Sequence, residues 1–177
     1  MKTRKAAGKL ILVLGGTASG KSQAALEAAG RARPKAFVAT GQARDREMAE
    51  RIARHRTARS ADWATVEVPV ELAAWFRRHG NGYRTIVLDC LTLWLSNLQG
   101  KRARDTEVSN RVTDLLEAIR STPARVVVVS NELGLGLVPT GRSARSFRDL
   151  AGRVNQQVAA EADEVYLAVS GLLLRLK

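Results

Sequence analysis

Residues 15–22 carry the clearest chemical signal in the sequence. They read Gly-Gly-Thr-Ala-Ser-Gly-Lys-Ser, which matches the phosphate-binding pattern G-x-x-x-x-G-K-[ST]. An apolar stretch precedes the motif and a helical pattern follows it, and in that context the backbone N–H groups of the glycine-rich loop surround phosphates. The sequence therefore predicts a cradle for the polyphosphate of a nucleotide, with the lysine near the β- and γ-phosphates and the last serine on Mg²⁺. The predicted nucleotide-binding residues of this loop are Gly15, Gly16, Thr17, Ala18, Ser19, Gly20, Lys21 and Ser22.

A second polar position follows the apolar stretch at residues 85–88. Asp89 stands where a strand would end, which is the place of the acidic residue that holds Mg²⁺ in proteins with this loop. A strand-end aspartate by itself more often caps the next helix. Together with the loop, a metal site made by Ser22 and Asp89 is the better interpretation. Asn131 and Glu132 follow another apolar stretch, and such strand ends line the ligand crevice of open α/β sheets.

His55 has two interpretations. It lies at the C-terminal end of a predicted helix over residues 45–56, on the inward face of that helix. The pattern alone favours a half-buried histidine that serves the fold. The alternative is a nucleophile, because a neutral imidazole can attack phosphorus and form a covalent intermediate. Arg56 and Arg59 would then stabilise the charge that develops on the phosphate oxygens.

The elements that must position these residues alternate between strand and helix. Strands are predicted at residues 10–14, 36–40, 85–89, 125–130 and 164–169, with a short last strand at 172–176 after a turn at 170–171. Helices are predicted at residues 21–31, 45–56, 70–78, 106–120 and 143–162. This alternation predicts an α/β P-loop NTPase fold of the RecA-like type, with a mainly parallel central sheet flanked by helices.

Bulk composition limits the class of protein. The chain has 177 residues, of which 45% are hydrophobic and 26% charged, and this suits one globular domain. We expect a basic N-terminal tail over residues 1–8 and a single nucleotide-binding domain over residues 9–177. The single cysteine excludes an internal disulfide, and no apolar stretch approaches a membrane span, so a cytoplasmic protein is expected. The net charge of +12 comes from scattered basic residues, which favours a solvated surface that attracts anions.

Longer motifs show a resemblance to one family over residues 10–177. The phosphate loop alone is generic, but the His-Arg-x-x-Arg stretch from His55 and the Asn-Glu-x-Gly-x-Gly-x-Val-Pro stretch at residues 131–139 are together specific. Further matches are Val38-Ala-Thr40, residues 45–52, Asp89-Cys-Leu-Thr-Leu and residues 147–156. On these residues the chain resembles the bifunctional adenosylcobinamide kinase / adenosylcobinamide-phosphate guanylyltransferases of cobalamin (vitamin B12) biosynthesis.

The resemblance implies two reactions, those of a kinase and a nucleotidyltransferase. Members phosphorylate adenosylcobinamide with a nucleoside triphosphate, ATP or GTP. They then transfer GMP from GTP to adenosylcobinamide phosphate through a guanylylated histidine, which gives adenosylcobinamide-GDP. By this resemblance His55 and Lys21 are catalytic, and the chain assembles as a homotrimer. The nucleotide contacts that it adds to the loop are Val38, Ala39, Thr40, Arg56, Thr57, Ala58, Arg59, Glu67 and Asp89.

Two alternative functions fit parts of the sequence. A P-loop kinase for another small molecule would explain the loop and Asp89 but not the pairing of His55 with Arg56. A nucleic-acid-binding protein would explain the charge, but aromatic residues make up only 5% and no zinc, RNP-type or helix-turn-helix pattern is present. The residues do not determine the base preference of the kinase step, the corrinoid contacts, or whether this chain retains both activities.

Overall fold

The computed structural model describes residues 8–43, 46, 49–50, 53, 60–100 and 103–177. Within these residues seven strands form one sheet, in the order β3-β2-β4-β5-β1-β6-β7. The first six strands in this order are parallel, and β7 pairs antiparallel with β6. The strands are β1 (Leu10–Gly15), β2 (Lys35–Ala39), β3 (Trp63–Glu67), β4 (Thr85–Asp89), β5 (Arg125–Asn131), β6 (Glu164–Val169) and β7 (Leu172–Arg175).

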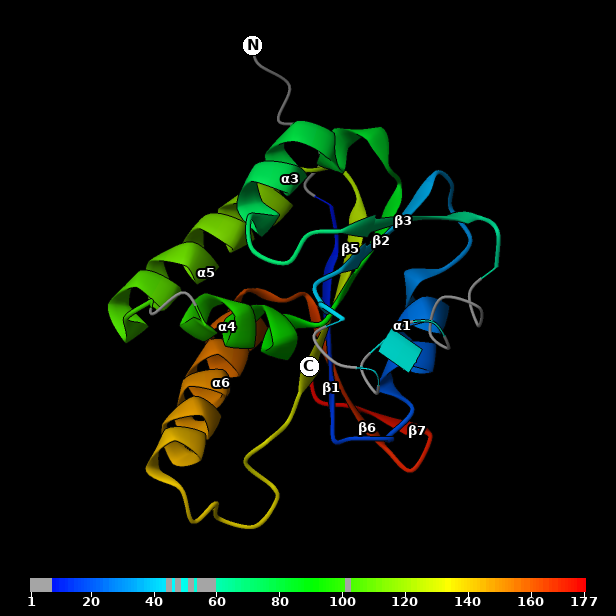
Figure 1. The fold of residues 1–177 in the computed structure, drawn as a ribbon. Coiled ribbons are helices and arrows are strands. Elements are labelled where there is room, and N and C mark those ends of the chain that lie inside the picture. The colour runs from blue at the N-terminus through cyan, green and yellow to red at the C-terminus, as the bar shows by residue number, and fades with distance from the viewer. Residues whose placement is uncertain (1–7, 44–45, 47–48, 51–52, 54–59, 101–102) are drawn as a thin grey trace.

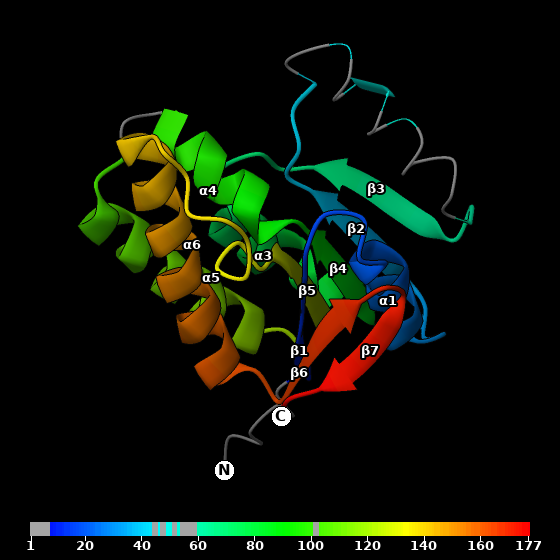
Figure 2. The same ribbon diagram turned by 90° about the horizontal axis from the view of Figure 1, so that it is seen from below.

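Helices cover both faces of this sheet (Figure 1). They are α1 (Lys21–Ala29), α3 (Leu72–His79), α4 (Leu91–Gly100), α5 (Asp105–Arg120) and α6 (Arg142–Glu161), with a short 3-10 turn, η1, at Gly80–Gly82. Helix α1 lies on one face and α3, α4, α5 and α6 lie on the other, as the view from below shows (Figure 2). Arg46, Ala49, Glu50 and Ala53 are also helical. This architecture confirms the predicted α/β fold with its mainly parallel sheet.

Strand β1 shows why the sheet is covered on both faces. Leu10, Leu12 and Leu14 belong to the core under α3 to α6, whereas Ile11 and Val13 belong to the core under α1. All five side chains are buried, none with more than 8% of its surface exposed. Successive side chains of a strand point to opposite faces, so a strand that is apolar throughout must lie between two packed layers.

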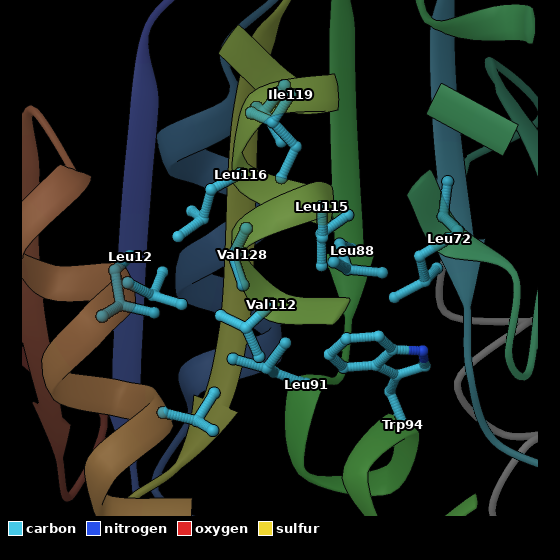
Figure 3. Packing of buried hydrophobic residues seen from close by; sticks show 14 of the residues in the cluster. Leu12, Leu72, Leu88, Leu91, Trp94, Val112, Leu115, Leu116, Ile119 and Val128 are labelled. Atoms are coloured by element: carbon cyan, nitrogen blue, oxygen red, sulfur yellow. The ribbon is translucent and has the colours of Figure 1, made fainter. Parts of the chain in front are cut away.

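The larger core fills the space between the sheet and the four helices (Figure 3). Leu88 of β4 packs there with Leu91 and Trp94 of α4 and with Leu115 of α5. Trp94 is 1% exposed, and its indole Nε1–H donates a 2.7 Å hydrogen bond to the Val70 carbonyl. The one polar atom of this buried ring is therefore satisfied, as burial of an N–H group requires.

Two elements were not among the predicted ones, α4 and β3. Helix α4 buries six of its ten residues, so it lacks the polar face from which helical periodicity is recognised. Strand β3 pairs only with β2 at the edge of the sheet, and none of its residues is fully buried. Its sequence includes Thr65 and Glu67, so it lacks the continuous apolar run by which a buried central strand is recognised.

Of the predicted basic tail, residues 1–7 lie outside the described residues, while Gly8 donates a backbone hydrogen bond to the Thr122 carbonyl at 3.0 Å. None of the helices in the described part of the chain combines the length and apolarity that crossing a bilayer would demand.

Asp163 fastens the start of β6 to β1 and α5. Its carboxylate accepts a hydrogen bond from Leu10 N at 2.6 Å and another from Arg120 Nη1 at 2.9 Å. Burial of the carboxyl raises its pKa, but the hydrogen bonds from Arg120 and the Leu10 amide, with the charges of Arg120 and Lys9, outweigh this and leave the pKa below its usual range. The charged form of Asp163 is therefore the one that stabilises the fold.

Removal of a core side chain tests the packing between β4 and α4. We expect Leu88→Ala to lower the free energy of unfolding by about 2–5 kcal/mol, because a fully buried side chain leaves a cavity. Leu135→Ala is the matched control, since Leu135 is 79% exposed and its loss should change stability by less than about 0.5 kcal/mol. Urea denaturation followed by circular dichroism measures both. Equal losses for the two variants would contradict this core.

The pH dependence of stability tests Asp163. An aspartate in the unfolded chain has a pKa of about 3.9, so Asp163 contributes stability above about pH 4 and loses it as the pH falls through its lower folded-state pKa. We expect Asp163→Asn to be less stable than wild type at pH 7, with a difference that shrinks on lowering the pH to 3. Urea titrations at the two pH values measure the difference. Asp62→Asn removes a surface ion pair with Arg33 and should change stability by less than about 1 kcal/mol at both; a pH-independent difference for Asp163→Asn argues against the assignment.

Candidate nucleotide-binding site

The phosphate loop, residues 15–22, connects the end of β1 to the start of α1. Its backbone is left-handed at Ala18 (φ 57°) and at Gly20 (φ 89°), and the second of these suits a residue without a Cβ atom. A Cβ atom at Gly15 would lie 2.4 Å from Ser19 Oγ and 2.8 Å from the Ala168 carbonyl oxygen. The loop therefore curls tightly against the end of the sheet, with glycine where the backbone closes on itself.

The C-terminal hairpin supports the loop from outside. Ser170 and Gly171 both have positive φ in the tight turn between β6 and β7, as the sequence predicted for a turn there. Gly171 N donates a hydrogen bond to the Ser19 carbonyl at 3.0 Å. A Cβ atom on Gly20 would lie 3.1 Å from the Gly171 Cα, so the two backbones are in close contact.

Two polar side chains of the loop, those of Lys21 and Ser19, are buried within it. Lys21 is 7% exposed, and its Nζ donates a 3.0 Å hydrogen bond to the Gly16 carbonyl, which spans the loop. Ser19 Oγ is buried, and within the described residues it has no hydrogen-bond partner. An unsatisfied buried hydroxyl costs about 1–3 kcal/mol, so the Ser19 side chain is held in the loop at a cost in stability. The predicted binding of a polyphosphate by this loop stays a prediction.

The next residue, Ser22, faces the end of β4. Its hydroxyl donates a 3.1 Å hydrogen bond to Asp89 Oδ2, although 67 residues separate the two in sequence. A hydroxyl beside a carboxylate supplies the hard oxygen ligands that Mg²⁺ prefers. Within the described part of the chain no group of three or more His, Cys, Asp or Glu side chains forms a metal cage. The Ser22–Asp89 pair therefore fits a metal that takes its remaining ligands from phosphates and water.

The residues at the end of β2 that are predicted to contact nucleotide lie beside Asp89, but most of them are buried. Ala39 lies opposite Asp89 in the sheet, and Val38 and Thr40 are both 0% exposed. The Thr40 hydroxyl donates to the Cys90 carbonyl at 2.7 Å and accepts the Cys90 N–H at 3.0 Å. The Thr40 carbonyl accepts Asn97 Nδ2 at 2.8 Å. Thr40 is thus bonded within the fold, and its predicted contact with nucleotide stays a prediction.

Cys90 follows Asp89 and is buried. Burial raises the pKa of its thiol to about 12, with a further contribution from the negative charge of Asp89. Because the thiolate is the reactive form of cysteine, a thiol that stays protonated at neutral pH is not a nucleophile. Cys90 therefore serves the fold beside Thr40.

Glu67 ends β3 at the same edge of the sheet. It lies opposite Ala39, which in turn lies opposite Asp89, so two strand spacings, about 10 Å, separate Glu67 from the residue that Ser22 contacts. Its predicted contact with nucleotide stays a prediction.

The predicted nucleophile and its neighbours, His55, Arg56, Thr57, Ala58 and Arg59, lie outside the described residues. Upstream of them, Arg46 Nε and Glu50 Oε1 form an i,i+4 ion pair at 3.0 Å on the helical segment predicted to carry the histidine.

A buried polar network on the other face of the sheet was not predicted. Ser130 Oγ donates to Asn155 Oδ1 at 2.7 Å, and Asn155 Nδ2 donates to the Asn131 carbonyl at 3.1 Å. Thr92 Oγ1 accepts the Asn131 N–H at 2.9 Å and lies 3.2 Å from Ser130 Oγ. These bonds join the end of β5 to α4 and α6. Residues 147–156 were noted for the family resemblance, but nothing in the sequence showed which strand they would contact.

Next to this network lies a cleft of about 590 Å³. One wall is the start of the β5–α6 loop and the other is α6. The sequence had marked Glu132 as a strand-end residue of a ligand crevice, and the structure places it in this cleft. Its lining includes Leu14, Glu132, Gly134, Arg148, Arg153 and Asn155.

Two solved structures share this arrangement of strands and helices. An ATPase from the type III secretion system of pathogenic bacteria gives a TM-score of 0.59 at 14% identity, over 96% of this chain and 57% of that chain. The P4 protein from bacteriophage phi6 in complex with ADP gives a TM-score of 0.50 at 17% identity, over 94% and 52%. This chain spans about half the length of these proteins, and at such identities the likeness concerns the fold.

Sequence relatives are much closer. Residues 11–176 match the family described as cobinamide kinase / cobinamide phosphate guanyltransferase. The chain is 39% identical over 180 residues to the bifunctional adenosylcobalamin biosynthesis protein CobU of Escherichia coli, covering 95% of this chain and 99% of that protein. It is 42% identical over 170 residues to the corresponding protein CobP of Pseudomonas aeruginosa, covering 94% and 96%. Identity at this level across nearly the whole of both chains shows that this protein belongs to the cobinamide kinase / cobinamide phosphate guanyltransferase family.

Proposed function

We propose that this protein catalyses two successive reactions of cobalamin biosynthesis. In the first, a nucleoside triphosphate phosphorylates adenosylcobinamide. In the second, GMP from GTP is transferred to adenosylcobinamide phosphate, giving adenosylcobinamide-GDP and pyrophosphate. The family match over residues 11–176 supports the choice of substrates. The observation that supports the chemistry is the 3.1 Å hydrogen bond from Ser22 to Asp89, because a hydroxyl and a carboxylate side by side at the phosphate loop suit a metal ion.

The phosphate loop binds the polyphosphate in both reactions. Backbone N–H groups of residues 15–20 and the N-terminal end of α1 face the phosphates, where the helix dipole favours negative charge. Lys21, now bonded to the Gly16 carbonyl, turns its ammonium group to the phosphates and stabilises the charge on the leaving group. Mg²⁺, when bound, neutralises phosphate charge and orients the phosphates for displacement. Ser22 and Asp89 are the residues that hold it.

Guanylyl transfer proceeds in two displacements. The imidazole of His55 attacks the α-phosphorus of GTP, a P–N bond forms, and the bond to pyrophosphate breaks. A phosphate oxygen of adenosylcobinamide phosphate then attacks the same phosphorus, and the P–N bond breaks to release the imidazole. Arg56 and Arg59 stabilise the charge on the equatorial oxygens. In the kinase step the γ-phosphate passes directly to the hydroxyl, so that reaction does not use His55.

The remaining predicted contacts belong to the nucleoside end of the nucleotide. Ala39, next to Asp89 in the sheet, and Glu67, one strand farther from the loop, lie in the direction that a nucleotide would extend from the phosphates. By the family resemblance, Thr57 and Ala58 complete this set.

A homotrimer is the assembly that we propose. The edge strand β7 supports contacts with another copy, because Leu172, Leu173 and Leu174 are between 41% and 76% exposed. A row of exposed leucines on an edge strand is seldom left open to water.

Replacement of the histidine separates the two reactions. We expect His55→Ala to abolish covalent labelling by α-labelled GTP and guanylyl transfer, while phosphorylation of adenosylcobinamide stays measurable. Intact mass after incubation with GTP and Mg²⁺ measures the added GMP, and corrinoid products are quantified by chromatography. The control is His79→Ala, which changes the exposed histidine at the end of α3 and should leave both reactions intact. Retention of the α-label by His55→Ala would remove this histidine from the mechanism.

Replacement of the lysine should affect both reactions together. Lys21→Ala removes a charged donor to phosphate, a contact with a net value of about 1.5–3 kcal/mol, so we expect kcat/KM to fall about 10- to 100-fold in each. Lys35→Ala is the control, because Lys35 lies at the amino end of β2, over the Trp63 ring, away from the phosphate loop. Steady-state rates for kinase and guanylyl transfer provide the measurement. A loss confined to one reaction would show that the two do not share this loop.

A further inference from the structure

We propose that the cleft between the β5–α6 loop and α6 binds the corrinoid acceptor through the arm that becomes phosphorylated, with Arg148 as the ligand of its phosphate. The exposed apolar residues 135–138 then lie against the corrin ring outside the cleft. This assignment rests on the proposed function and names the second-substrate site that the function requires.

The cleft adjoins the phosphate loop. Strand β5 is next to β1 in the sheet, Asn131 lies opposite Gly15, and Glu132 N donates a 3.1 Å hydrogen bond to the Gly15 carbonyl. Glu132 and Leu14 both line the cleft, so the cleft begins beside the first residue of the phosphate loop. In phosphoryl transfer the acceptor oxygen must approach the phosphorus in line with the leaving group. A second-substrate site is therefore needed directly beside the loop.

The wall of the cleft that α6 forms is held in place by hydrogen bonds. Asn155 lines the cleft from α6, and its side chain is held by Ser130 and by the Asn131 carbonyl at 2.7 and 3.1 Å. It is 5% exposed. Hydrogen bonds of this kind fix α6 against the carboxyl end of β5. One wall of the cleft is thereby held in a set position relative to the phosphate loop, as transfer between two bound substrates requires.

Two arginines line the cleft, and they differ in their ion pairs. Arg148 is a lining residue whose side chain is only 21% exposed, and among the described residues its ion pair is a long one, 3.8 Å from Nε to the adjacent Asp149. Arg153, the other lining arginine, is bonded to Asp105 of α5 at 2.5 Å. A guanidinium has five N–H donors and suits bidentate binding of phosphate. Among the described residues Arg148 thus lacks a close ion pair, so its donors can bind an incoming phosphate, whereas Asp105 already neutralises Arg153.

The size of the cleft limits which part of the corrinoid it can hold. A volume of about 590 Å³ suits an arm of the substrate, whereas a corrin macrocycle with its side chains must lie outside. The loop that leaves the cleft at Gly134 carries Leu135, Leu137 and Val138, which are 79%, 96% and 66% exposed. Figures 1 and 2 show this loop beside the phosphate loop, at the carboxyl edge of the sheet. A cluster of exposed apolar side chains beside a polar cleft suits a large ligand with an apolar face.

Binding measurements on the full chain test the phosphate contact. Isothermal titration calorimetry measures the Kd of adenosylcobinamide phosphate. We expect this Kd to rise at least tenfold in Arg148→Ala. It should rise less in Arg148→Lys, because lysine keeps the charge but not the bidentate geometry. The Kd of GTP should change less than twofold. Arg78→Ala is the control, since it removes an exposed charge from α3. Melting temperatures confirm that each variant is folded.

A second variant tests the apolar loop. Leu137 is almost fully exposed in this chain, so Leu137→Asp should fold normally. We expect it to raise the Kd of adenosylcobinamide and of its phosphate alike, about threefold to tenfold. Light scattering is measured in parallel. Unchanged corrinoid binding together with a lower oligomeric mass would show that residues 135–138 contact another copy of the chain, which overturns this part of the proposal.

The outcomes separate the inference from the function on which it rests. Binding of the corrinoid phosphate with equal Kd values for wild type, Arg148→Ala and Arg148→Lys would place the acceptor elsewhere and overturn the inference. No binding of the corrinoid phosphate by wild type, or absence of turnover in a wild type that binds it through Arg148, would instead overturn the proposed function.

Discussion

The phosphate loop depends on its contact with the last hairpin of the chain, where Gly171 donates its N–H to the Ser19 carbonyl. The loop is left-handed at Ala18, which costs about 1–2 kcal/mol for a residue with a side chain, and also at Gly20. An isolated loop would relax from this conformation. The β6–β7 hairpin prevents relaxation because β6 pairs with β1 and its turn packs on the loop. The C-terminal end of the chain therefore shapes the site near its N-terminal end.

Parallel pairing then concentrates polar groups at one edge of the sheet. Strands β1, β4 and β5 all end there, bringing together the phosphate loop, Asp89 and Glu132. The strands themselves are apolar on both faces, so polar residues are admitted only where the strands end. This explains how Ser22 and Asp89, which are 67 residues apart in sequence, form the hydrogen-bonded pair that we propose as the metal site.

The two faces of the sheet differ in what they contribute to the proposed enzyme. In the proposed mechanism, helix α1 on one face would receive the nucleotide phosphates at its N-terminal end. Helix α6, on the other face, carries Arg148 and the buried Asn155 beside the cleft. Donor and acceptor would then approach the carboxyl edge of the sheet from opposite faces. The buried network around Ser130 and Asn155 keeps this geometry, since each of its members is hydrogen-bonded.

The sequence by itself determined the features that depend on local chemistry. Residues 15–22, the buried central strands and the turn at Ser170 and Gly171 were all predicted, because backbone conformation and side-chain alternation are recorded within a few neighbouring residues. Family motifs added His55 and its neighbours, which lie outside the described residues. Within the fold, α4 and β3 escaped prediction because one is buried on most sides and the other lies at an edge.

Only the tertiary structure decided which distant residues meet. It placed Ser22 against Asp89, bonded Thr40 to Cys90, and gathered Glu132 and Arg148 into one cleft. Periodicity shows that a strand is buried but not which strands lie beside it, and the order of strands in this sheet differs from their order in the chain. Contacts across that order follow from the packing of the whole sheet, so no local pattern can contain them.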